Sequence, residues 1–166
     1  MFSDSLITQA QALLTQCRKN GFLLVTAESC TGGLIAALLT EIPGSSSVFE
    51  RGFVTYSNAA KIAQLGVPEA LLAEHGAVSA QVAQAMAQGA LANSHASLSV
   101  SVTGIAGPDG GTADKPVGLV YIAVGMQKGG MFVKEFRFEG DRRQVRLATV
   151  AEALALLMDA AGRKQS

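Results

Sequence analysis

Charged residues are scarce in this sequence, and their signs balance. Asp, Glu, Lys and Arg make up 16% of the 166 residues, and thirteen basic side chains offset thirteen acidic ones. A chain without net charge has no overall field that draws it to nucleic acid or to an anionic membrane. We therefore expect neither as a partner. Hydrophobic residues make up 49%, which indicates a compact protein and excludes a disordered one.

Long apolar segments and targeting signals are also missing. No run approaches the roughly 18 apolar residues that a membrane-spanning helix needs. The first residues, MFSDSLITQAQALL, have no basic stretch ahead of their apolar positions, so they do not resemble a signal peptide. We therefore expect a cytoplasmic protein. The length suits a single domain over residues 1–166.

Cysteine and histidine are too few to build a metal centre. The two cysteines, Cys17 and Cys30, have neither zinc-site nor disulfide spacing. His75 and His95 are isolated from each other and from the scattered carboxylates, so no metal-ligand set is visible. Cys17 falls among apolar positions at helical spacing, and we expect it in the core.

Hydrophobic periodicity predicts helices that alternate with strands. Helices are expected at 6–17 (ended by Gly21), 33–41, 59–65, 68–74, 80–92 (capped by Ser79) and 142–161 (capped by Asp141). Strands are expected at 22–27, 48–56, 97–103, 117–126 and 131–138, the last two joined as a hairpin through 127–130. This order predicts the α/β class, with a single layered domain in which helices flank a mixed β-sheet.

Four segments place polar residues or glycines where a strand is expected to end. These segments are residues 27–33, 56–61, 103–111 and 140–142. Ligands of open α/β sheets collect outside the carboxyl ends of the strands. The four turns together therefore predict a binding site at one edge of the sheet.

The first of these turns leads from a strand into a helix through Gly32 and Gly33. Small residues let backbone N–H groups approach a ligand, and a helix start favours negative charge, such as a phosphate or a reaction oxyanion. Thr31, Gly32 and Gly33 are therefore candidate substrate-binding residues. Ser29 and Thr31 are equally ordinary capping residues, so the turn also has a purely structural interpretation.

Two neighbouring residues, Ser29 and Cys30, are candidate nucleophiles. Extended neighbours point to opposite faces, and a cysteine in this setting more often packs as a small apolar residue. A serine needs a base, which Lys61 can supply if burial or a nearby cation lowers its pKa. Tyr56 adds a phenol suited to a proton relay. The alternatives are a solvated helix lysine for Lys61 and a core aromatic for Tyr56.

The last two turns contain groups suited to anions. Residues 103–111 are rich in glycine but lack both the P-loop Lys-Ser/Thr pair and the GxGxxG pattern. Their N–H groups suit a phosphate or carboxylate, unless the segment is only a flexible connection. Arg142 and Arg146 share one helix face, while Arg143 points about 100° away. Paired arginines suit a phosphate.

Six motifs in a fixed order give the sequence a family resemblance. AESCTGG, RGFVTYSNAAK, GAVS, SVTGIAGPDGG, KPVG and FEGDRRQVR together resemble the CinA C-terminal domain family, over residues 6–158. Members of that family include nicotinamide-nucleotide amidohydrolases. The resemblance implies a small-molecule nucleotide as the partner. It also implies hydrolysis of nicotinamide mononucleotide to nicotinic acid mononucleotide and ammonia, a step in pyridine nucleotide salvage. No metal or organic cofactor is implied.

The resemblance also assigns roles to individual residues. It makes Ser29 the nucleophile, activated by Lys61 together with Tyr56. The resemblance further implies that a loop and the arginines of the last turn bind the substrate. The loop residues are Thr103, Gly104 and Gly107. Among the arginines, helix geometry favours Arg142 and Arg146. Because family members tend to self-associate, we also expect a homo-oligomer.

Two other functional classes compete with this interpretation. A non-catalytic nucleotide-binding or regulatory domain would use the same glycine-rich loops, but it has no need of a serine–lysine pair. A serine–lysine hydrolase of peptides or other amides would need the pair. Short loops suited to phosphate argue against the extended groove that a peptide requires.

Overall fold

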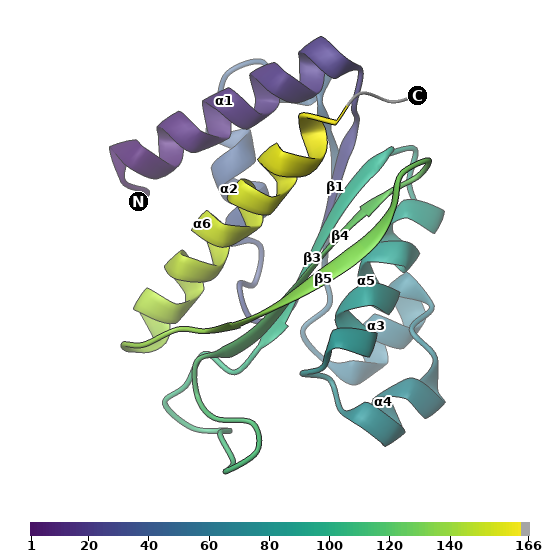
Figure 1. The fold of residues 1–166 in the computed structure, drawn as a ribbon, viewed down its shortest axis with the longest axis vertical. Helices are drawn as coiled ribbons and strands as arrows, with labels where there is room; N and C mark the ends of the chain where they lie inside the picture. Colours follow the sequence, from purple (N-terminus) through teal and green to yellow (C-terminus); the bar gives the residue numbers. More distant parts are fainter. Residues whose placement is uncertain (164–166) are drawn as a thin grey trace.

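A five-stranded sheet forms the centre of the protein in a computed structural model that describes residues 1–163 (Figure 1). The strands are β1 (Leu24–Glu28), β2 (Phe49–Val54), β3 (Leu98–Gly104), β4 (Leu119–Met126) and β5 (Gly130–Arg137). Their order across the sheet is β2-β1-β3-β4-β5. The first three are parallel, and β4 and β5 pair antiparallel as a hairpin. The predicted mixed sheet of the α/β class is confirmed.

Helices cover both faces of the sheet (Figure 1). One face carries α1 (Asp4–Asn20), α2 (Leu34–Thr40) and α6 (Arg142–Ala161). The other side carries α3 (Asn58–Leu65), α4 (Glu69–His75) and α5 (Ala80–Ala92). A short 3₁₀ helix, Ser45–Ser47, precedes β2. Each predicted helix is present, and those at 80–92 and 142–161 have the predicted bounds.

The helices begin and end at residues with recognisable capping chemistry. Gly21 ends α1 in the left-handed conformation, with φ of 73°. The Ser79 hydroxyl accepts a hydrogen bond from the backbone of Val82 at the start of α5. Asp141 and Gln144 form a reciprocal capping box at the start of α6, each side chain bonded to the other's backbone N–H at 2.8 Å. All three predicted caps are confirmed.

The main hydrophobic core lies between the sheet and the helices α1, α2 and α6. Cys17 is fully buried there, as predicted. The alternation of valine and serine along β3 separates the two faces, because the valines join this core and the serines face α5. Ser101 donates a hydrogen bond to the Ala83 carbonyl of α5 at 2.5 Å. Small serines therefore let α5 lie close to the sheet with their hydroxyls satisfied.

The helices α3 and α5 also touch through a residue without a side chain. A Cβ atom on Gly89 would lie 1.9 Å from the Leu65 carbonyl oxygen, which no real side chain tolerates. Glycine at this position lets the C-terminal end of α3 pack directly on α5. This contact fixes α3 on α5, which itself packs on the sheet, and α3 carries Lys61.

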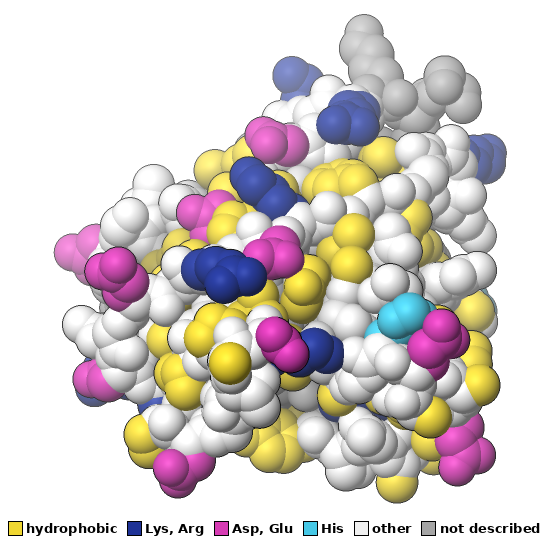
Figure 2. All heavy atoms as spheres, turned by 60° about the horizontal axis from the view of Figure 1, so that its bottom comes forward, with side chains coloured by type: hydrophobic (Ala, Val, Ile, Leu, Met, Phe, Trp, Pro, Cys, Tyr) yellow, Lys and Arg dark blue, Asp and Glu magenta, His cyan; other side chains and the backbone are white. Residues whose placement is uncertain are grey.

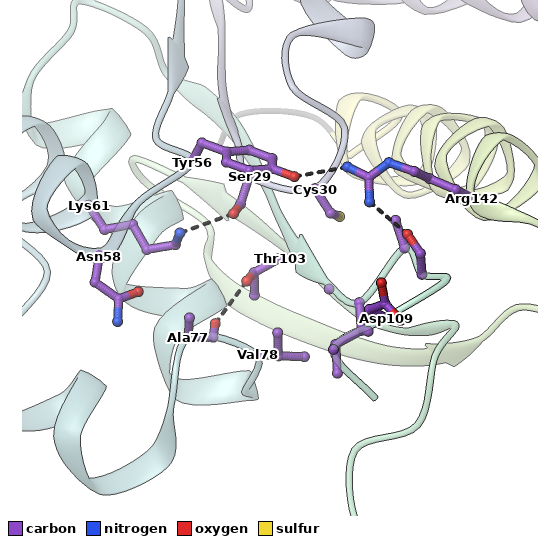
Figure 3. A pocket seen from close by; sticks show the side chains of 15 residues that line it. Ser29, Cys30, Tyr56, Asn58, Lys61, Ala77, Val78, Thr103, Asp109 and Arg142 are labelled. Atoms are coloured by element: carbon purple, nitrogen blue, oxygen red, sulfur yellow. Dashed lines mark hydrogen bonds between the residues drawn. The ribbon is translucent and has the colours of Figure 1, made fainter. Parts of the chain in front are cut away.

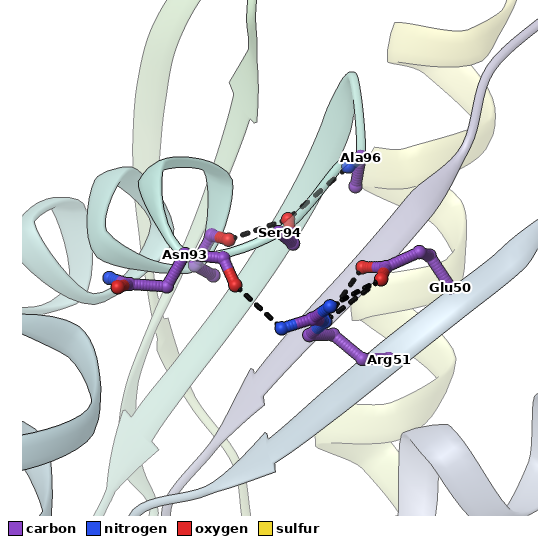
Figure 4. Close-up of polar contacts among 6 residues, drawn as sticks. Glu50, Arg51, Asn93, Ser94 and Ala96 are labelled. Carbon is purple, nitrogen blue, oxygen red and sulfur yellow. Dashed lines mark hydrogen bonds and ion pairs between the residues drawn. The ribbon is translucent and has the colours of Figure 1, made fainter.

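A polar contact ties the edge strand β2 to the end of α5 (Figure 4). The Arg51 guanidinium donates to the Asn93 carbonyl at 2.9 Å and binds the Glu50 carboxylate at 2.7 Å. A cation is favourable at the C-terminal end of a helix, where carbonyl groups lack partners. Ser94 bonds the Ala90 carbonyl and the Ala96 N–H, and so completes the turn into β3.

The surface carries both signs of charge. Figure 2 shows the face at the bottom of Figure 1, where basic and acidic side chains are interspersed among hydrophobic ones without a broad patch of one sign. Within residues 1–163, no helix combines the length and the apolar character that crossing a bilayer requires.

A buried carboxylate holds the connection between β1 and α2. Glu28 is fully buried at the end of β1. Its oxygens accept hydrogen bonds from the Thr31 hydroxyl at 2.7 Å and from the backbone N–H groups of Ile35 and Ala36 at 2.9 and 3.0 Å. The sequence predicted a helix start open to a ligand's negative charge. In the structure, the protein's own carboxylate occupies that position.

Replacing Glu28 by Gln tests this contribution to stability. We expect the free energy of unfolding to fall by about 1–3 kcal/mol, because an amide nitrogen then faces a donor that had a carboxylate partner. Urea unfolding followed by circular dichroism measures the change. The matched control is Glu41→Gln, an exposed glutamate at the other end of α2, which should change stability by less than about 0.5 kcal/mol. Equal stability of the two variants would contradict this role.

Candidate active site

The carboxyl ends of four strands meet at one edge of the sheet. The strands β1, β2 and β3 are parallel to one another. The strand β5 runs in the same direction as β3, because both are antiparallel to β4, which lies between them. The four turns identified in the sequence follow these four strands. All of them contribute residues to one cleft with a volume of about 270 Å³. Strand topology thus brings together residues that lie more than a hundred positions apart.

Ser29 and Lys61 are in direct contact at one end of this cleft (Figure 3). Ser29 follows β1 directly, and its backbone N–H is bonded to the Val102 carbonyl of β3 at 3.0 Å. The Lys61 amine lies 3.0 Å from the Ser29 hydroxyl and donates to the Thr55 carbonyl at 2.9 Å. Both side chains are buried, with 8% of Ser29 and 1% of Lys61 exposed.

The environment of Lys61 favours its neutral form. Burial lowers the pKa of the Lys61 amine below its ordinary value of 10.5. No carboxylate among residues 1–163 forms an ion pair with it. A neutral amine can donate to Thr55 while it accepts the Ser29 hydroxyl proton through its lone pair. This is the arrangement expected of a nucleophile and its general base.

Local structure explains how each member of the pair is placed. The Ser57 hydroxyl caps α3 by accepting from the Ala60 N–H at 3.0 Å, which fixes the helix start four residues before Lys61. On the other side, Gly32 and Gly33 adopt left-handed φ angles of 59° and 99° between β1 and α2. A residue with a side chain adopts such angles at a cost, so glycine permits the sharp turn just after the serine.

Cys30, the competing candidate nucleophile, is in a different environment. Its side chain is part of the main core and 5% exposed, although the residue also borders the cleft. Burial raises the pKa of the Cys30 thiol to about 12, so the thiol stays protonated near neutral pH. The thiolate is the reactive form of cysteine. The geometry therefore favours Ser29 as the nucleophile.

Tyr56 lies at the mouth of the cleft, apart from Lys61. Its side chain is largely exposed, at 60%, and its hydroxyl accepts a hydrogen bond from Arg142 at 2.9 Å (Figure 3). Within the described residues, no hydrogen bond joins Tyr56 to Lys61 or to Ser29. The structure does not assemble the predicted relay, because Tyr56 precedes the cap of α3 whereas Lys61 lies one turn inside the helix.

The two arginines of α6 occupy different places. Arg142 borders the cleft and donates to the Gly107 carbonyl at 2.8 Å. Arg146 lies one helical turn further along and is outside the cleft lining. Its guanidinium donates to the carbonyls of Cys30 and Thr31 at 3.1 and 2.9 Å. Arg146 therefore supports the turn that carries Ser29, and Arg142 is the arginine available to a ligand.

Of the remaining candidate substrate-binding residues, some line the cleft and others do not. Thr31, Gly32 and Gly33 are not among the residues that line the cleft, and the Thr31 hydroxyl is bonded to Glu28. The loop after β3 does line it, through the predicted positions Thr103, Gly104 and Gly107. Thr103 donates its hydroxyl to the Ala77 carbonyl at 2.8 Å, which joins this loop to the segment before α5.

Several cleft residues were not singled out in the sequence. They are Asn58, Ala77, Val78, Ile105, Ala106, Asp109 and Gly110. Each belongs to one of the motifs that carry the family resemblance, so the motifs themselves are the signal that identifies them. Neither histidine borders the cleft. Among residues 1–163, no three His, Cys, Asp or Glu side chains are grouped to hold a metal ion.

Comparison with known sequences places this chain in a family. A model of the CinA C-terminal domain matches residues 7–161. The putative competence-damage inducible protein of Caldicellulosiruptor bescii is 58% identical over 79% of this chain and 32% of its own length. The CinA-like protein of Geobacter sulfurreducens is 54% identical over 91% of this chain and 36% of its own length. The chain spans about a third of the length of these relatives.

Solved structures share the fold along almost the whole chain. The competence/damage inducible protein CihA from Agrobacterium tumefaciens has a TM-score of 0.95 and 49% identity, covering 98% of this chain and 99% of that chain. The competence damage-inducible protein A from Klebsiella pneumoniae has a TM-score of 0.92 and 35% identity, covering 96% of this chain and 99% of that chain. By its family model, its relatives and its fold, this chain belongs to the CinA C-terminal domain family.

Proposed function

We propose that this chain is an amidohydrolase that deamidates nicotinamide mononucleotide in pyridine nucleotide salvage. The products are nicotinic acid mononucleotide and ammonia. The observation that carries the proposal is the buried Lys61 amine, 3.0 Å from the Ser29 hydroxyl and without an acidic partner among residues 1–163. A domain that only binds nucleotides has no use for such a pair, and burying a lysine costs stability.

The proposed reaction follows from this geometry. The Ser29 oxygen attacks the carboxamide carbon, and its proton passes to the Lys61 amine. The resulting ammonium returns that proton to the amide nitrogen as ammonia leaves, and an ester on Ser29 remains. Water, deprotonated by Lys61, then attacks the ester carbon, and the Ser29 oxygen leaves with the proton that Lys61 returns. The released carboxylic acid gives its own proton to the solvent and becomes the carboxylate. Each proton accepted by Lys61 is returned, so the pair is regenerated.

The shape and the charges of the cleft support a small phosphorylated substrate. Its volume of about 270 Å³ suits a small molecule better than an extended peptide. Figure 3 shows Arg142 on the opposite side of the cleft from Lys61. A substrate with an amide at one end and a phosphate at the other fits this separation, because a guanidinium binds phosphate through charge-assisted hydrogen bonds.

Replacing the nucleophile gives the first test of this function. We expect Ser29→Ala to reduce the rate of ammonia release from nicotinamide mononucleotide by more than about 1000-fold, because the attacking oxygen is gone. Cys30→Ala is the neighbouring control and should retain most of the activity. Circular dichroism verifies that both variants are folded. An inactive Cys30→Ala together with an active Ser29→Ala would assign the nucleophile to the thiol.

A second test concerns Lys61 as the base. We expect Lys61→Arg to be nearly as inactive as Lys61→Ala, because a guanidinium keeps its proton at any accessible pH. For the wild type, kcat/KM should fall as the pH is lowered, with a midpoint below 10.5, because protonation removes the lone pair that accepts the serine proton. A substantial kcat in Lys61→Arg would show that Lys61 acts through its positive charge and is not the base.

Lys61→Met is the folding control for this test, because it keeps the length of the side chain without the titrating group. Since the pKa of Lys61 is lowered in the folded state, the unfolded chain binds the proton more readily. The wild type should therefore gain stability relative to Lys61→Met as the pH rises toward 10.5. Urea unfolding at several pH values measures this difference, and no pH dependence would contradict a lowered pKa.

A third test concerns the phosphate. We expect nicotinamide riboside, which lacks it, to have a kcat/KM at least about tenfold lower than the nucleotide, because charge-assisted hydrogen bonds are lost. Arg142→Gln should reduce this preference. Arg143→Gln, an exposed arginine outside the cleft lining, should leave it unchanged. Equal kcat/KM values for riboside and nucleotide in the wild type would contradict the assignment of a phosphate site.

A further inference from the structure

Asp109 provides the one carboxylate among the described residues that line the cleft. It lies in the glycine-rich loop between β3 and β4, and its side chain borders the same cleft as Ser29 and Lys61 (Figure 3). Within residues 1–163, the Asp109 carboxylate forms no hydrogen bond and no ion pair. The proposed reaction gives it no role. Asp109 therefore offers hydrogen-bond acceptors to whatever occupies the cleft.

The nearby cation does not neutralise this carboxylate. Arg142 borders the cleft on the same side, but its guanidinium is bonded to the Gly107 carbonyl at 2.8 Å and to the Tyr56 hydroxyl at 2.9 Å (Figure 3). It forms no ion pair with Asp109. Among the described residues, the side of the cleft away from Lys61 thus presents a positive group and an unpaired negative group. A ligand that satisfies both must contain an anion and, separately, hydrogen-bond donors.

The loop that carries Asp109 is anchored to the body of the protein. The Lys115 amine donates to the His75 carbonyl at the end of α4, at 2.6 Å. Thr112 and Lys115 are bonded to each other by their backbones at 2.7 Å and through the threonine hydroxyl at 3.0 Å. These contacts hold residues 112–115 of the loop against α4, and the hydrogen bond from Arg142 to the Gly107 carbonyl holds the part of the loop next to Asp109.

We propose that Asp109 binds the vicinal 2′ and 3′ hydroxyls of the substrate's ribose and selects ribonucleotides over deoxyribonucleotides. This inference rests on the proposed function, which places the carboxamide at Ser29 and the phosphate at Arg142. The ribose links these two groups and must lie between them, beside the loop that contains Gly107 and Asp109. A carboxylate repels the phosphate but accepts hydrogen bonds from two neighbouring hydroxyls, as acidic residues do for ribose in dinucleotide-binding folds.

The test compares nicotinamide mononucleotide with its 2′,3′-dideoxy analogue, which lacks both hydroxyls. We expect the wild-type kcat/KM to favour the ribonucleotide by about tenfold or more, since two charge-assisted hydrogen bonds are involved. Asp109→Ala should bring this ratio close to one by lowering the value for the ribonucleotide alone. The matched control is Asp114→Ala, an exposed aspartate of the same loop outside the cleft lining, which should keep the wild-type ratio.

A binding measurement keeps this inference separate from the proposed chemistry. Calorimetric titration of Ser29→Ala, with and without Asp109→Ala, gives Kd for both nucleotides without turnover. Ribose-selective binding that depends on Asp109, without ammonia release by the wild type, would support the inference and overturn the proposed function. Ammonia release with an Asp109→Ala effect that is absent, or equal for both nucleotides, would overturn the inference alone. Failure of both nucleotides to bind, with no ammonia release by the wild type, would overturn both the inference and the proposed function.

Discussion

The burial of one amine without a counter-ion among residues 1–163 is the constraint on which the site depends. A lysine in a protein interior is unfavourable when charged, and Lys61 has a backbone carbonyl and a serine hydroxyl as its partners. Both partners come from the ends of adjacent parallel strands, because Thr55 follows β2 and Ser29 follows β1. The amine is held there by α3, which packs on α5 through Gly89. Strand order and helix packing therefore determine the burial and the partners of the Lys61 amine, and through them its pKa.

Two charged side chains near the serine, the buried Glu28 and the half-buried Arg146, have an architectural role. Glu28 satisfies the first N–H groups of α2, and Arg146 donates to the carbonyls of Cys30 and Thr31 on the other side of the same turn. Between them they satisfy donors and acceptors that a sharp turn leaves without helical partners. The AESCTGG motif thus combines one functional group that borders the cleft, the Ser29 hydroxyl, with residues that hold it in position.

Sequence reasoning was most accurate where the signal was local. The caps Ser79 and Asp141 fixed the starts of α5 and α6, since capping depends on residues within one helical turn. Strand order was not predicted, because pairing joins segments far apart in the chain. The contacts of Tyr56 and Arg146 also depend on that three-dimensional arrangement. Spacing placed Arg142 and Arg146 on one helix face. It could not show that Arg142 borders the cleft, whereas Arg146, one helical turn further along, binds the Cys30 and Thr31 carbonyls.

In the proposed reaction, the substrate itself favours the reactive form of the base. Its pyridinium ring is positively charged and would lie next to the carboxamide that Ser29 attacks. A nearby cation further disfavours a protonated lysine, in the same direction as burial. The product differs, because its new carboxylate is an anion that favours the ammonium form of Lys61. Binding of substrate and formation of product would therefore shift the same proton equilibrium in opposite directions, and this couples the charge of Lys61 to progress through the reaction.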